Sequence, residues 1–95
     1  MGNSSIEWNK DKNDELKQKR GVSFDDVVQA VEDDRVLYDG PHENRTKYRH
    51  QRMLIVDSGD YAYVVPYVID EERGYVFLKT IYASRKQTKH YSKPK

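Results

Sequence analysis

The sequence predicts an α+β domain, with two N-terminal helices packed on a four-stranded antiparallel sheet and a short C-terminal helix after the last strand. Three observations favour this fold. Capping residues flank two helical segments before residue 35. After residue 35 the apolar residues alternate with a period of two, as strands require. Turn-forming residues divide that region into four segments, and helices followed by consecutive strands are typical of a two-layer α+β fold.

The two helices are predicted from their caps and from one apolar stripe. The first spans residues 10–19, with Asn9 as its N-cap and Gly21 just after its end. The second begins at Ser23, which forms a capping-box pattern with Asp26. Its apolar side chains follow helical spacing and should face the sheet: Phe24, Val27, Val28 and Val31. The acidic residues 32–34 oppose the helix dipole and so end the helix, or else they form a patch for a basic partner.

The strands are predicted over residues 35–38, 47–57, 61–69 and 74–82, separated by turns at 39–41, 58–60 and 70–74. Ser84 then starts a short basic helix that ends near residue 91. Pro66 has no N–H to donate, so we expect it at a sheet edge or a bulge. The sheet face away from the helices should be free. We expect residues 1–5 to be a flexible start, 6–91 to be a single domain and 92–95 to be a frayed end.

The composition excludes several classes of protein. The 95 residues include no Cys, which excludes disulfides, Cys-based zinc sites and thiol nucleophiles. The three histidines are widely spaced and match no metal-binding motif, so we expect neither a metal nor a cofactor. No apolar run approaches the ~20 residues of a membrane span, and the first residues lack a signal-peptide pattern. We therefore expect a cytoplasmic protein with no membrane attachment.

Acidic and basic residues are segregated along the chain. Residues 1–43 carry six Lys or Arg against eleven Asp or Glu, whereas residues 44–95 carry eleven against five. Two stretches, 45–52 and 79–95, contain basic residues and no acid. Positive charge placed in this way attracts polyanions such as RNA. The alternative is that these charges only keep a small domain soluble.

The first basic stretch mixes cations with aromatic and amide groups. Such a mixture suits single-stranded RNA, whose phosphates are neutralised while its bases stack. The candidate side chains for RNA contact or catalysis in this stretch are Lys47, Tyr48, Arg49, His50 and Arg52. By itself the pattern also fits an exposed loop that leads into a strand, and that reading is the commoner one.

The second basic stretch begins in the last predicted strand. Lys79 alternates there with Tyr75, Phe77 and Ile81 on one face, so it is either a lysine that snorkels to the edge or an amine that contacts phosphate. Arg85 and Lys86 follow directly at the start of the last helix, with Lys89 one turn later. Their position suits phosphate binding, although two exposed cations on a tail are also common.

Any catalysis would have to use Arg, Lys, His, Tyr or Glu43, because the chain lacks Cys and metal-binding motifs. This set matches metal-free RNA cleavage. A base activates the 2′-hydroxyl, a cation stabilises the charge on the transition state, and an acid protonates the leaving oxygen.

Two segments at their observed separation resemble the BrnT family of bacterial toxins, and the resemblance spans residues 6–91. The first comprises residues 6–9, Lys12 and Asn13, and the run at 19–26, which reads Lys-Arg-Gly-Val-Ser-Phe-Asp-Asp. The second is the run at 81–86, Ile-Tyr-Ala-Ser-Arg-Lys, with Thr88 and Tyr91. One departure stands out, because Arg20 occupies a position where the family typically has His.

The resemblance implies a RelE-like fold and a metal-independent endoribonuclease that arrests translation. It also implies a cognate antitoxin with a ribbon-helix-helix fold. Arg52 takes the place of a basic residue at the start of the family's second strand. Arg85 and Lys86 take the place of the basic pair implicated in RNA cleavage. For proton transfer we favour Lys79 or His50.

Two other readings remain open at this level. The chain could be a non-catalytic binding module that keeps the RelE-like scaffold and acts through an antitoxin or another protein, as the replacement of the family His by Arg20 suggests. It could also be a gyrase-type poison on a scaffold of the same kind.

Overall fold

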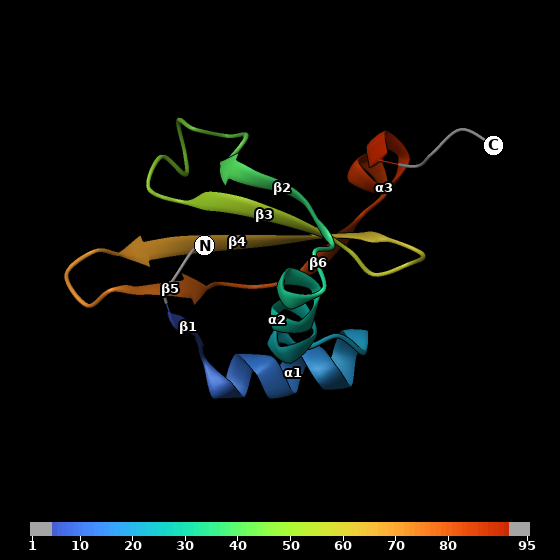
Figure 1. Ribbon diagram of the computed structural model, residues 1–95, viewed down its shortest axis with the longest axis horizontal. Helices are drawn as coiled ribbons and strands as arrows, with labels where there is room; N and C mark the ends of the chain where they lie inside the picture. Colours follow the sequence, from blue (N-terminus) through green and yellow to red (C-terminus); the bar gives the residue numbers. More distant parts are fainter. Residues whose placement is uncertain (1–4, 92–95) are drawn as a thin grey trace.

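The computed structural model describes residues 5–91 and has a mixed α+β fold (Figure 1). The sheet order is β1-β5-β4-β3-β2, and β6 also pairs with β4. Helices α1 and α2 pack on one face of the sheet and α3 packs on the other. The elements in chain order are β1 (Ser5–Trp8), α1 (Lys10–Arg20), α2 (Phe24–Glu32), β2 (Val36–Pro41), β3 (Arg52–Asp57), β4 (Ala62–Asp70), β5 (Tyr75–Leu78), β6 (Tyr82–Ser84) and α3 (Arg85–Tyr91).

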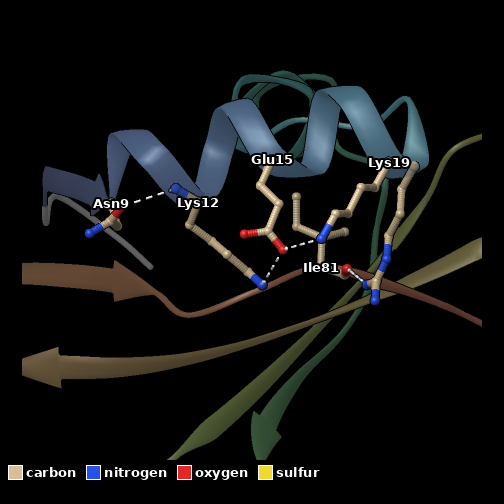
Figure 2. Close-up of polar contacts among 6 residues, drawn as sticks. Asn9, Lys12, Glu15, Lys19 and Ile81 are labelled. Atoms are coloured by element: carbon tan, nitrogen blue, oxygen red, sulfur yellow. Dashed lines mark hydrogen bonds and ion pairs between the residues drawn. The ribbon is translucent and has the colours of Figure 1, made fainter.

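The predicted helix caps are confirmed. The Asn9 side chain accepts a hydrogen bond from the Lys12 N–H at 2.9 Å, and Gly21 ends α1 in the left-handed region at φ 65°. Ser23 and Asp26 form both hydrogen bonds of a capping box at the start of α2. On the exposed face of α1, Figure 2 shows Lys12 and Lys19 contacting the Glu15 carboxylate from either side.

A buried asparagine joins the two helices. The Asn13 side chain accepts a hydrogen bond from the Phe24 N–H at 2.7 Å and donates one to Asp25 at 3.3 Å. It thereby satisfies a backbone donor in the first turn of α2, where no partner exists within the helix. Leu16, Phe24 and Val27 then pack together in the core on this side of the sheet.

Ser5, the last residue of the expected flexible start, instead begins β1. This strand pairs in parallel with β5, with Ile6 opposite Val76 and Trp8 opposite Leu78. The Trp8 ring stacks on Phe24 with 5.7 Å between ring centroids. Four alternating residues are too short a pattern to predict a strand before its partner is known. Residues 1–4 and the expected frayed end at 92–95 lie outside the described residues.

The turn expected at residues 39–41 is instead part of β2, which pairs with β3 as far as Pro41 opposite Arg52. The strand expected over 47–57 begins only at Arg52, so residues 42–51 form the connection. A Cβ at Gly40 would lie 2.5 Å from the Tyr38 hydroxyl, so a larger residue there would displace the Tyr38 ring. The glycine lets the Tyr38 ring lie across its own strand.

The last predicted strand is interrupted opposite Pro66. Tyr67 pairs with Leu78, but Val64 pairs with Tyr82, so two residues of β4 stand opposite three on the other strand. This extra residue is a β-bulge, as expected for proline. The Lys79 N–H donates to the Pro66 carbonyl at 2.8 Å, and Pro66 has no N–H to return the bond.

The bulge changes which way the following side chains point. Ile81 was expected on the face of Phe77 and Lys79, but it is fully buried in the helix-side core with Leu78. Arg20 at the end of α1 donates a hydrogen bond to the Ile81 carbonyl (Figure 2). Tyr82 then pairs with Val64 and lies on the opposite face.

The sheet face away from α1 and α2 was expected to be free, but part of it is covered. A second buried cluster lies there, and Tyr91 of α3 packs against it: Met53, Ile55, Ala62 and Val64. We call this the α3 face of the sheet. Successive side chains of β3 and β4 point to opposite faces of the sheet, and both faces are covered. These central strands are therefore apolar and buried almost without interruption.

Exchanging Ile81 for Ala tests the bulge. We expect Ile81→Ala to lower the free energy of unfolding by about 2–5 kcal/mol, because it empties a fully buried site. Ile69→Ala removes the same atoms from a side chain that is 48% exposed and should cost less than about 1 kcal/mol. Urea unfolding of both variants gives the comparison. Equal costs would mean that the last strand runs without a bulge and exposes Ile81.

Candidate functional site

The connection between β2 and β3 folds back on itself on the α3 side of the molecule. Asn44 organises it, because its side chain accepts from the Lys47 N–H and its carbonyl accepts from the Tyr48 N–H. The Asn44 N–H donates to His42 Nδ1 at 3.0 Å, and the His42 ring lies 4.5 Å from that of Tyr48 between centroids. The first basic stretch is therefore an ordered loop rather than the start of a strand.

Helix α3 is fixed to the sheet through Ser84 and Thr88. The Ser84 hydroxyl accepts from the Gln87 N–H at 3.2 Å, and the Thr88 hydroxyl donates to the Ser84 carbonyl at 2.6 Å. Thr88 also accepts from the Ala62 N–H of β4 at 2.8 Å. These bonds set the position of the predicted basic residues on α3, whose side chains are exposed: Arg85, Lys86 and Lys89.

The loop and α3 meet at a pair of opposite charges. The Lys86 ammonium lies 3.4 Å from a carboxylate oxygen of Glu43, although the two residues are far apart in sequence. Both side chains are more than half exposed, so the pair adds little stability, and it leaves both groups accessible to a ligand.

Tyr82 lies beside this pair. Burial of its ring raises the pKa of the Tyr82 phenol, and the charge of Glu43 and the neighbouring Tyr48 raise it further. The phenol therefore stays protonated at neutral pH and can donate a hydrogen bond. Its side chain is still about one third exposed. A carboxylate and an ammonium group thus meet on the α3 face, and the charge of the carboxylate acts on a neutral phenol nearby.

Other predicted cations lie in the loop and on the α3 face of the sheet. The Lys47 ammonium is 5.2 Å from the centroid of the Tyr48 ring, and Lys79 is 5.6 Å from that of Phe77, which places Lys79 on the α3 face. Arg49 and His50 are exposed in the loop. A pocket of about 210 Å³ lies between the sheet and α3, next to Glu43, and is lined mainly by Tyr38, Met53, Ile55, Gln87, His90 and Tyr91.

Arg52 does not join this group. It is paired with Tyr67, whose side chain belongs to the helix-side core, so Arg52 lies on the opposite face from Lys86. Its guanidinium donates to the Tyr67 hydroxyl at 2.9 Å and lies 3.7 Å from Asp39. The Tyr67 hydroxyl in turn donates to Asp39. This network crosses β2, β3 and β4, and it gives Arg52 a structural role.

Sequence reasoning did not identify Tyr82 or His42 as members of the site. Tyr82 was placed in an unbroken strand, where it would face α1 and α2. His42 was considered only as a metal ligand. Two sequence features could have indicated these residues. Pro66 in β4 shifts the register before Tyr82, and the spacing of His42, Asn44 and Tyr48 fits a tight loop.

Over residues 5–91, no cluster of three or more His, Cys, Asp or Glu side chains could hold a metal ion. No helix among these residues is long and apolar enough to cross a membrane. No protein-family model, curated protein or solved structure matches this chain. A functional conclusion therefore depends on the geometry of the side chains described above.

The Tyr67 network predicts a loss of stability at alkaline pH. Burial raises the pKa of Tyr67 to about 12, and the hydrogen bond to Asp39 adds to the effect while that from Arg52 opposes it. A tyrosine in the unfolded chain titrates near 10. The stabilisation is therefore complete below about pH 10 and falls by about 2–3 kcal/mol as the pH rises towards 12.

Urea unfolding of the native sequence and of Tyr67→Phe at a series of alkaline pH values measures this effect. The difference between the two proteins removes the contribution of the other tyrosines. The native sequence should lose stability more steeply than the variant between about pH 10 and 12. Parallel curves would contradict a buried, protonated Tyr67.

Proposed function

We propose that this chain is a metal-independent endoribonuclease, the toxin component of a toxin–antitoxin pair, and that RNA binds on its α3 face. The observation that carries the proposal is the contact between Glu43 and Lys86 beside the protonated Tyr82. The basic residues of the loop, of the α3 face and of α3 itself supply the charge that RNA phosphates require: Lys47, Arg49, Lys79, Arg85 and Lys89. The resemblance to BrnT toxins and their RelE-like fold agrees with this reading.

The proposed reaction uses Glu43, Lys86 and Tyr82. The Glu43 carboxylate takes the proton of the ribose 2′-hydroxyl, whose oxygen then attacks the adjacent phosphorus. Lys86 and Arg85 stabilise the added negative charge on the phosphoryl oxygens. Tyr82 donates its proton to the departing 5′-oxygen. The products are a 2′,3′-cyclic phosphate and a free 5′-hydroxyl, and Glu43 ends protonated while Tyr82 ends ionised until water restores both.

Aromatic groups next to the cations support a single-stranded substrate. Tyr48, which packs on the buried His42 ring, is partly exposed at the loop, and the pocket beside Glu43 has aromatic walls and the Gln87 amide. Bases that are not paired in a duplex can stack on such surfaces. Lys79 and His50 remain candidates for contact with neighbouring phosphates, whereas Arg52 acts through the fold.

The second candidate function is a non-catalytic module that acts through an antitoxin or another protein. One observation favours it. Arg20 stands where the family has His, and its guanidinium is bonded to the Ile81 carbonyl on the helix side. That position therefore supplies no proton-transfer group to the α3 face. A ribonuclease built on this chain has to rely on Glu43 and Tyr82 instead.

RNA cleavage in the presence of EDTA tests the proposal directly. The purified chain should cut single-stranded RNA to products with 2′,3′-cyclic phosphate ends. Glu43→Gln removes the base and should slow cleavage by about 10²–10⁴-fold. Lys86→Ala removes a stabilising cation and should slow it by about 10²–10³-fold.

Matched controls separate chemistry from charge. Glu71→Gln and Lys10→Ala make the same charge changes at exposed positions away from the site and should leave the rate unchanged. Intact RNA at excess protein would rule out the enzyme.

A growth test in cells checks the same proposal. Expression of the chain should arrest growth, and Glu43→Gln or a ribbon-helix-helix antitoxin should relieve the arrest. Harmless expression would favour the binding module.

A further inference from the structure

A cleft on the helix side of the sheet is separate from the α3 face. It has a volume of about 480 Å³ and lies between α2 and the turn that joins β3 to β4. The apolar residues that line it include Val27, Ala30 and Val56, which are buried in the core, and Tyr63, which is partly buried. Tyr61 stands at the rim with half of its side chain exposed. An apolar floor with an exposed aromatic rim is typical of a surface that receives another side chain.

The rim of the cleft is acidic. Asp26, Asp57 and Asp60 line it, and Arg35 is the basic residue among the lining side chains. Arg35 is already engaged, because it donates to the Asp57 carbonyl at 2.7 Å and lies 3.4 Å from Asp33. Its charge is thus largely offset by a carboxylate outside the cleft. The rim keeps a negative balance that repels phosphate and attracts cations.

The carboxylates differ in what they already bind. One oxygen of Asp26 accepts from the Ser23 N–H in the capping box, and one oxygen of Asp57 accepts from the Gly59 N–H. Asp60 is exposed in the turn next to Tyr61. Each carboxylate therefore has an oxygen that can face a ligand, while the bonds to the backbone hold Asp26 and Asp57 in position.

From this combination we infer that the cleft binds a basic peptide segment of a partner protein, one that carries an Arg or Lys next to an apolar side chain. The apolar side chain fills the floor, and the cation reaches the carboxylates at the rim. The charge complementarity excludes nucleic acid as the occupant. Because the cleft and the α3 face lie on opposite sides of the sheet, the partner leaves the proposed RNA site open.

NMR titration of the full chain, labelled with ¹⁵N, tests this inference. The probe is a short blocked peptide that alternates Arg and Leu, compared with one in which Glu replaces Arg and one in which Ser replaces Leu. The Arg/Leu peptide should shift the amide signals of Val27, Ala30, Val56 and Tyr61. The other two peptides should not, because each lacks one of the two features that the cleft recognises.

Two variants with equal loss of charge locate the binding. Asp57→Asn with Asp60→Asn should weaken binding of the Arg/Leu peptide roughly tenfold, about the value of two partly exposed ion pairs. Glu71→Gln with Glu72→Gln, in the turn between β4 and β5, should not change it. Equal weakening by both pairs would overturn the inference in favour of general attraction. Shifts that depend on protein concentration without peptide would overturn it in favour of a second copy of this chain.

Discussion

The missing N–H of Pro66 in the central strand is the constraint on which the arrangement of the site depends. Because Pro66 cannot complete the hydrogen-bonded pair with Lys79, the last strand breaks into β5 and β6 with one extra residue between them. The register change buries Ile81 under α1 and α2, where Arg20 holds its carbonyl, and sends Tyr82 to the other face. Helix α3 follows directly, so Lys86 comes within reach of Glu43.

The two faces of the sheet consequently differ in chemistry. The α3 face carries the basic residues of the loop and of α3, and Lys86 among them contacts the Glu43 carboxylate. On the other face, the cleft beside α2 has an acidic rim over an apolar floor. The charge segregation along the chain becomes a segregation in space because the sheet separates the loop and α3 from α2. A polyanion and a cationic partner can then bind without competing for the same surface.

The sequence predicts best those features that depend on neighbouring residues. The caps at Asn9 and Ser23 and the stop at Gly21 are local, and they are all found where the sequence places them. Features that depend on distant pairing were missed: β1 needs β5 beside it, and the extension of β2 to Pro41 needs β3. Tyr82 was missed for the same reason, since the register of its strand is set by a proline some sixteen residues earlier in the chain. Distant pairing also decides which face Arg52 occupies. Its charge and position suggested phosphate binding, but it contacts Tyr67 and Asp39 on the helix side of the sheet.

An RNA that cannot be cut tests the proposed binding site without relying on turnover. The ¹⁵N-labelled chain is titrated with a single-stranded oligonucleotide whose 2′-hydroxyls are methylated, so that no cleavage occurs. The proposed site predicts shifts in the amide signals of residues 42–51 and 79–89, with α1 and the turn at 58–61 unaffected. Shifts centred on α2 and the turn at 58–61, or no shifts at saturating RNA, would contradict it.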